Sequence, residues 1–177
     1  LGIADHWIRR KTLEVVRDVT DAYDRFEFSK AAQLAYDFAW HEFADWYVEA
    51  AKIQKGMYQY AVLTDVLETI LRILHPAMPF TTEALWSRLR SNDAQVAAML
   101  IQEHWPESQA PSVVKKPFSF GNIVDDADPF VFVQRIVTAI RQIQNEDKIP
   151  PKTSCIVTLA TVNSEERTWC EDLEIRQ

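Results

Sequence analysis

The apolar side chains of residues 3–26 recur mostly every three or four positions, which places them on one face of an α-helix. This apolar stripe consists of Ile8, Val15, Val16, Val19, Ala22, Tyr23 and Phe26. Three aspartates, Asp18, Asp21 and Asp24, fall on the opposite side, and neither Gly nor Pro interrupts the segment. The pattern predicts one long amphipathic helix.

A second helix is predicted from about residue 30 to residue 55, with Ser29 as its N-cap. Its apolar residues are Ala35, Phe38, Ala39, Trp40, Phe43, Trp46, Tyr47 and Ala50. They cover nearly every side of the helix, which is typical of a buried helix. We therefore expect Trp40 to lie in the core, where its replacement by Ala would cost about 3–5 kcal/mol.

Three further helices are predicted. One covers residues 58–74, after Gly56, and ends at His75-Pro76, because proline disfavours helical geometry in the residue before it. The next extends to about residue 90, with Thr81 or Thr82 as N-cap and Glu83 in its first turn. The last opens with Asp128 as N-cap and Pro129 at its first position, and Pro150-Pro151 ends it.

The end of the chain has a different pattern. Residues 91–128 look irregular, residues 154–161 are β-branched and apolar like a strand, and residues 164–175 read as a helix. The predicted fold is mainly α: an antiparallel helical bundle over residues 1–152, followed by the start of a small β-α element over 153–177. We interpret the chain as an excised fragment.

Composition excludes several classes of protein. The three glycines lie far apart, so no Gly-rich phosphate loop can form. The two cysteines lack a metal-site spacing and are expected to be reduced thiols. With neither a signal peptide nor an apolar run of about 18 residues, the chain is expected in the cytoplasm and off the membrane. The net charge of −7 leaves only a local basic face for nucleic acid.

No motif for catalysis or metal binding is found, and we expect neither kind of site in this chain. The four histidines lack a zinc-site spacing. His41 is expected to be a partnered structural residue, and His75, at a helix end, a capping residue. Asp45, beside Trp46, is expected to be a buried hydrogen-bond acceptor.

Two groups of cations could contact phosphate. Arg9, Arg10 and Lys11 are consecutive, so on a helix they point about 100° apart and cover most of its circumference. Near the end of the last helix lie Arg141, Lys148 and Lys152. A solvated surface is the alternative interpretation for both groups.

Five segments together resemble the class I valyl-tRNA synthetases: residues 3–7, 34–47, 74–86, 104–106 and 139–152. The segment 34–47, which ends in Asp-Trp-Tyr, is similar to the family's second-helix signature. Residues 75–86 look like the His-Pro-x-x-Pro-Phe-x-x-Glu-x-Leu-Trp segment that the valyl, isoleucyl and leucyl enzymes share. His6 and Ala44 depart from the family, which often has Arg and Cys at these two positions.

The resemblance implies most of a class I anticodon-binding domain, without a first helix that would lie before Leu1. Such a domain binds the anticodon stem-loop of tRNA-Val beside the catalytic domain of a monomeric parent. The parent uses ATP and Mg²⁺ to charge the tRNA, whereas this fragment lacks the His-Ile-Gly-His and Lys-Met-Ser-Lys-Ser signatures and holds no cofactor. Two alternatives stay open: a structural module that braces the catalytic domain or docks a protein, and the equivalent domain of an isoleucyl or leucyl enzyme.

Overall fold

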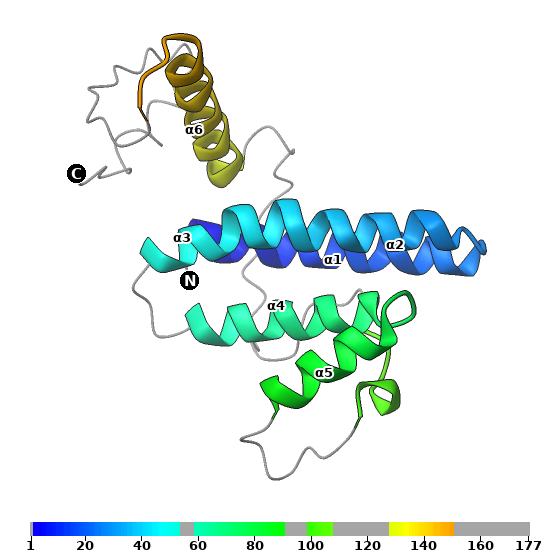
Figure 1. Cartoon of the computed structure of the whole chain (residues 1–177). Coiled ribbons are helices and arrows are strands. Elements are labelled where there is room, and N and C mark those ends of the chain that lie inside the picture. The colour runs from blue at the N-terminus through cyan, green and yellow to red at the C-terminus, as the bar shows by residue number, and fades with distance from the viewer. Residues whose placement is uncertain (1, 54–58, 91–98, 108–127, 151–177) are drawn as a thin grey trace. The chain divides into compact units, whose positions relative to one another are not determined.

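The computed structural model describes residues 2–53, 59–90, 99–107 and 128–150, and within these ranges all regular structure is helical (Figure 1). The mainly α prediction is therefore confirmed. The chain divides into two compact units, residues 1–117 and 118–177. The strand predicted at 154–161 and the helix predicted at 164–175 lie outside the described residues. None of the described helices is long and apolar enough to cross a membrane.

In the first unit, helix α1 (Ile3–Asp24) follows the predicted pattern. Val15, Val16, Val19 and Ala22 are buried, as expected from their spacing. The helix ends in a Schellman motif, in which the amide of Glu27 donates to the carbonyl of Ala22 and the amide of Phe26 to the carbonyl of Tyr23. The chain then reverses and runs antiparallel beside α1 (Figure 1).

The returning segment is one long helical stretch made of three parts: α2 (Phe28–Asp37), the π-helix η1 (Phe38–Tyr47) and α3 (Val48–Ile53). The N-cap prediction for Ser29 was wrong, because Ser29 lies inside the first turn and Glu27 occupies the cap position. The Schellman motif turns the chain so tightly that the new helix begins directly at Phe28.

The π-helix changes which residues face the core. Its wider turns let the buried positions step from Phe38 to Phe43, five residues on, and then to Tyr47. Trp40 falls on the outside, where 55% of its surface is exposed, and stacks on Tyr36 with ring centroids 6.3 Å apart. The core position predicted for Trp40 was therefore wrong.

A buried hydrogen bond joins this stretch to the start of α1. The hydroxyl of Tyr47 donates to Asp5 Oδ1 at 2.8 Å, while Asp5 Oδ2 accepts the amide of Gly2, also at 2.8 Å. Burial, followed by this bond to Asp5, raises the pKa of Tyr47 far above its usual range. One carboxylate thus closes the first turn of α1 and fixes the far end of η1 against it.

Helix α4 (Gln59–Leu74) packs against both α1 and α2, and α5 (Pro79–Leu89) packs against α4. The N-cap prediction for Thr81 or Thr82 was wrong, since Met78 occupies the cap position. Thr82 is buried inside α5, where its hydroxyl donates to the Met78 carbonyl and contacts His75 Nδ1 at 2.8 Å. His75 therefore links the end of α4 to α5.

Glu83 holds the short 3-10 helix η2 (Leu100–Gln102) instead of acting in the first turn of α5. Its two carboxylate oxygens accept the amides of Leu100 and Ile101, each at 2.9 Å.

Nearby, the indole of Trp86 is 1% exposed and lies close to two guanidinium groups. Those of Arg72 and Arg90 lie 5.3 and 5.1 Å from its ring centroid. Both arginines also reach Glu68, Arg90 at 2.7 Å and Arg72 at 3.8 Å. This cluster joins α4 to α5.

In the second unit, α6 (Pro129–Glu146) begins as predicted. Asp128 is the N-cap, its carboxylate accepting the amide of Phe130 at 2.8 Å, and Pro129 follows at the first helical position. At the other end, Lys148 takes a left-handed conformation with φ of 54°. This residue stops the helix before Pro150-Pro151 is reached.

Candidate nucleic-acid interface

The predicted contacts Arg9, Arg10 and Lys11 form no common patch on α1. Arg10 and Lys11 both reach Glu14, at 3.7 and 3.4 Å. Burial raises the pKa of the Asp65 carboxyl on α4, and the charge of Arg9 opposes this shift. The three cations are half-buried, and Arg10 and Lys11 share the carboxylate of Glu14.

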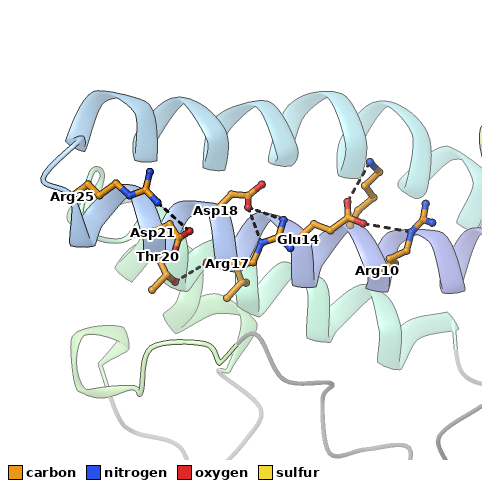
Figure 2. Close-up of polar contacts among 9 residues, drawn as sticks. Arg10, Glu14, Arg17, Asp18, Thr20, Asp21 and Arg25 are labelled. Atoms are coloured by element: carbon orange, nitrogen blue, oxygen red, sulfur yellow. Dashed lines mark hydrogen bonds and ion pairs between the residues drawn. The ribbon is translucent and has the colours of Figure 1, made fainter. Parts of the chain in front are cut away.

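The same alternation of charge continues along the exposed side of α1, as Figure 2 shows. Arg17 contacts Asp18 at 2.9 Å, and this contact raises the pKa of the Arg17 guanidinium. Near the end of the helix, Arg25 lies 3.9 Å from Asp21. Each cation in this row has a carboxylate beside it, so the row carries little excess positive charge.

The loop and helix that follow repeat this arrangement, with Lys30 on Glu27 and Lys52 on Glu49. Exposed pairs of this kind are weak, typically about 0–1 kcal/mol, because water screens them. A phosphate could therefore replace the carboxylate at little cost. The described residues of the first unit offer cations that can exchange partners, but among these residues the cations of α1 do not form a broad basic surface.

The candidates of the second unit lie at its surface. Arg141 is exposed on α6, and Lys148 is exposed just beyond the end of this helix. A cation at this end also complements the helix dipole. Lys152 lies outside the described residues.

In the described ranges, no group of three or more His, Cys, Asp or Glu side chains is placed to hold a metal ion. His41 has a partner, since its Nδ1 lies 3.6 Å from Asp45, but both side chains are exposed. The prediction of a buried acceptor at Asp45 was therefore wrong. The buried carboxylate is Asp5, which accepts the hydroxyl of Tyr47, the last residue of the Asp-Trp-Tyr segment.

The sequence analysis missed an aromatic cluster at the turn between α1 and α2, which we call the tip cluster: Phe26, Phe28, Tyr23 and Trp105. The Phe26 and Phe28 rings lie 6.1 Å apart, and the Tyr23 ring lies 6.2 Å from Phe28 and 5.6 Å from Trp105. Trp105 Nε1 donates to Thr20 of α1 at 2.8 Å. Phe26 and Phe28 are well exposed, at 77% and 59%.

The absence of a glycine between the first two helical patterns is the one signal in the sequence that could have indicated this cluster, because another residue must then occupy the left-handed position of the turn. A Schellman motif places a residue in the left-handed region, usually Gly, and the chain has no Gly between the first two helical patterns. Phe26 was instead assigned to the apolar stripe of α1, because its spacing continues that stripe. The position of a helix end could not be read from the spacing alone.

Comparisons with a family profile and with individual proteins point to the same family, the tRNA ligases. The sequence profile of a family described as the anticodon-binding domain of tRNA ligase matches residues 5–159. The chain is 38% identical over 162 residues to a valine–tRNA ligase of Mycolicibacterium paratuberculosis, covering 90% of this chain and 17% of that protein. A valine–tRNA ligase of Pseudothermotoga lettingae is 34% identical over 98% of this chain and 19% of its own length. This chain thus spans less than a fifth of these relatives.

Proposed function

This chain belongs to the anticodon-binding domain family of tRNA ligases, and on that premise we propose that it binds the anticodon stem-loop of tRNA-Val. The observation that carries the proposal is the family match over residues 5–159, on a chain whose described residues fold as a helical bundle. Anticodon bases are unstacked, so a protein can read their edges and stack on their faces.

We propose further that the chain acts within a cytoplasmic, monomeric valine–tRNA ligase. That enzyme would use ATP and Mg²⁺ to esterify valine to its tRNA, and both would act in parts of the protein outside this chain. Residues 1–152 would form the anticodon-binding bundle and residues 153–177 the start of an α/β appendage. The bundle would lie against the catalytic domain and contribute by positioning, because binding energy gathered far from the reacting atoms can lower a barrier.

Valine is favoured over isoleucine or leucine because the relatives of this chain are named valine–tRNA ligases. One observation supports a purely structural role as the second candidate. The cations of α1 lie beside carboxylates, so their attraction for phosphate is partly offset. In that case the bundle would brace the catalytic domain without holding RNA.

Charge reversal separates the two functions. We expect Arg141→Glu and Lys148→Glu to weaken binding of a valine anticodon stem-loop. The affinity of each variant should also depend less on salt, because fewer counterions are released when fewer phosphates are contacted. Lys52→Glu, at an exposed pair on α3, is the matched control and should leave binding unchanged. Affinities of Arg141→Glu and Lys148→Glu that match the parent protein would show that these two cations do not contact the RNA. A parent protein that binds no stem-loop would favour the structural role.

A further inference from the structure

The turn between α1 and α2 places a phenylalanine where helices usually have glycine. Phe26 occupies the C′ position of the Schellman motif with φ of 59°. A side chain with a Cβ is strained in the left-handed region, and for a bulky side chain this conformation is a true outlier. Glycine would remove the strain without changing the hydrogen bonds of the turn.

Burial does not offset this strain, because 77% of the surface of Phe26 remains exposed. The second left-handed residue among those described, Lys148, completes the same motif at the end of α6, but its side chain is polar and suited to solvent. A strained residue at an interaction surface is a recognised pattern, and here the strain presents an aromatic ring to the outside.

The remaining rings of the tip cluster connect Phe26 to the body of the bundle. Phe28 meets Phe26 edge to face at 6.1 Å, and Tyr23 links Phe28 to Trp105. The bond from Trp105 Nε1 to Thr20 fixes this chain of rings to α1. Phe26 and Phe28 therefore contact rings that are themselves held in place, and this lowers the entropy lost when a ligand stacks on them.

Charge distinguishes the tip cluster from the other exposed aromatic residues. Among those that the structure describes, only Phe26 and Phe28 have Lys or Arg within four residues along the chain, namely Arg25 and Lys30. Both cations are exposed, and their partners Asp21 and Glu27 are exposed as well, so the pairs can open.

The stacked pair Tyr36 and Trp40 has different surroundings. Neither Lys nor Arg occurs between Lys30 and Lys52, whereas several carboxylates do. That part of the helical stretch therefore has no cation of its own, whereas the tip cluster has Arg25 and Lys30 beside its two outer rings along the chain.

We propose that Phe26 and Phe28 form a stacking platform for an unpaired base of the bound tRNA, with Arg25 and Lys30 contacting the phosphates beside it. This inference rests on the proposed function and assigns part of that interface to the turn between α1 and α2. Aromatic stacking with a neighbouring cation is a general way to hold single-stranded RNA.

The test uses four substitutions and a valine anticodon stem-loop as probe. Phe26→Leu keeps an apolar side chain but loses the aromatic face, so its affinity should fall about fivefold or more. Phe26→Gly should bind as weakly while melting at the same or a higher temperature, since it relieves strain. Phe26→Tyr keeps the ring and should bind like the parent protein. Phe80→Leu, at a ring that is 91% exposed on α5, is the control and should have no effect.

A second readout reports contact directly. A stem-loop carrying 5-iodouridine at an unpaired position should crosslink under light to the peptide that contains Phe26, and the Leu variant should lose that crosslink.

The outcomes separate the stacking platform from the proposed function. Normal affinity for both the Leu and Gly variants would overturn the platform and leave anticodon binding intact. A Tyr variant as weak as the Leu variant would also overturn it, and so would a clear drop in melting temperature for the Gly variant, which would make the ring structural. A parent protein that binds no stem-loop would overturn the proposed function itself.

Discussion

At the residue scale, two tryptophans that both lie in helical segments differ in burial. Trp86 of α5 is buried, with the guanidinium groups of Arg72 and Arg90 near its ring, whereas Trp40 lies on the outer side of η1. The cost of removing an aromatic ring depends on the contacts and the cavity that it leaves behind. The stability of the bundle therefore depends far more on Trp86 than on Trp40.

We expect Trp86→Ala to lower the free energy of unfolding by about 3–5 kcal/mol, because it empties a packed site and leaves the charges of Arg72 and Arg90 without their aromatic contact. Trp40→Ala should cost less than about 1 kcal/mol, as for an exposed side chain. Urea denaturation followed by circular dichroism would measure both. Equal losses for the two variants would contradict this assignment of the core.

Trp40 also shows the limit of what could be predicted at this scale. The sequence correctly indicated a strongly apolar helix, but apolar residues on nearly all sides do not reveal which side faces inward. In the π-helix the next buried residue after Phe38 is Phe43, which is five residues further along the chain. An α-helix would place it three or four residues further along. For the same reason Asp45 lies outside, and the buried acceptor is Asp5, forty-two positions from Tyr47 along the chain.

At the scale of elements, an N-cap was predicted correctly only where the capping side chain and a following proline occur together. Asp128 and Pro129 met that condition, and the structure confirms the cap. Ser29 and Thr82 have good capping side chains, yet both lie inside their helices, because the turns before them place Glu27 and Met78 at the cap positions. Local propensity was overruled there by the geometry of the preceding turn.

Asp128→Ala should destabilise α6 by about 1 kcal/mol, since the amide of Phe130 loses its acceptor and the negative charge leaves the positive end of the helix dipole. Asp147→Ala is the matched control at the other end of α6, where a negative charge opposes the dipole, and should be neutral or slightly stabilising. Amide hydrogen exchange of α6 would measure both changes. Equal protection of the two variants would rule out the capping role.

At the scale of the whole molecule, the charges described on the exposed side of α1 form alternating pairs and not a basic face. Acidic residues outnumber basic ones by 26 to 19, and the described cations of α1 lie beside carboxylates (Figure 2). The acidic balance is read directly from the sequence. The sequence also predicted that Arg9, Arg10 and Lys11 point apart, whereas Arg10 and Lys11 both reach Glu14. It could not predict the pairing, because that depends on which rotamers and neighbouring helices bring the charges together.

A pH dependence follows from Glu42, which is half-buried. Burial raises the pKa of Glu42 above its usual 4.5, and the charge of nearby Lys11 opposes this shift. The raised pKa means that folding favours the protonated form, so this contribution to stability is complete below pH 4.5 and is lost as pH rises through the folded-state pKa.

We expect Glu42→Gln to melt at a higher temperature than the parent protein at pH 7, with the difference shrinking toward pH 4 as the parent's carboxyl takes up its proton. Glu49→Gln, at an exposed position on α3, should show no such trend. Differential scanning calorimetry across this range would measure the differences. A gap between the Glu42→Gln variant and the parent protein that widens as pH falls would refute the burial argument.

Anticodon recognition is tested most directly by the dissociation constants of two hairpins, measured at two salt concentrations. One is the valine anticodon stem-loop, and the other is the same hairpin with its anticodon exchanged. We predict tighter binding of the valine hairpin, with a ratio that persists at the higher salt concentration, because contacts to bases release few counterions while contacts to phosphates release many. Equal dissociation constants for the two hairpins at both salt concentrations, or no binding of either, would contradict anticodon recognition by this chain.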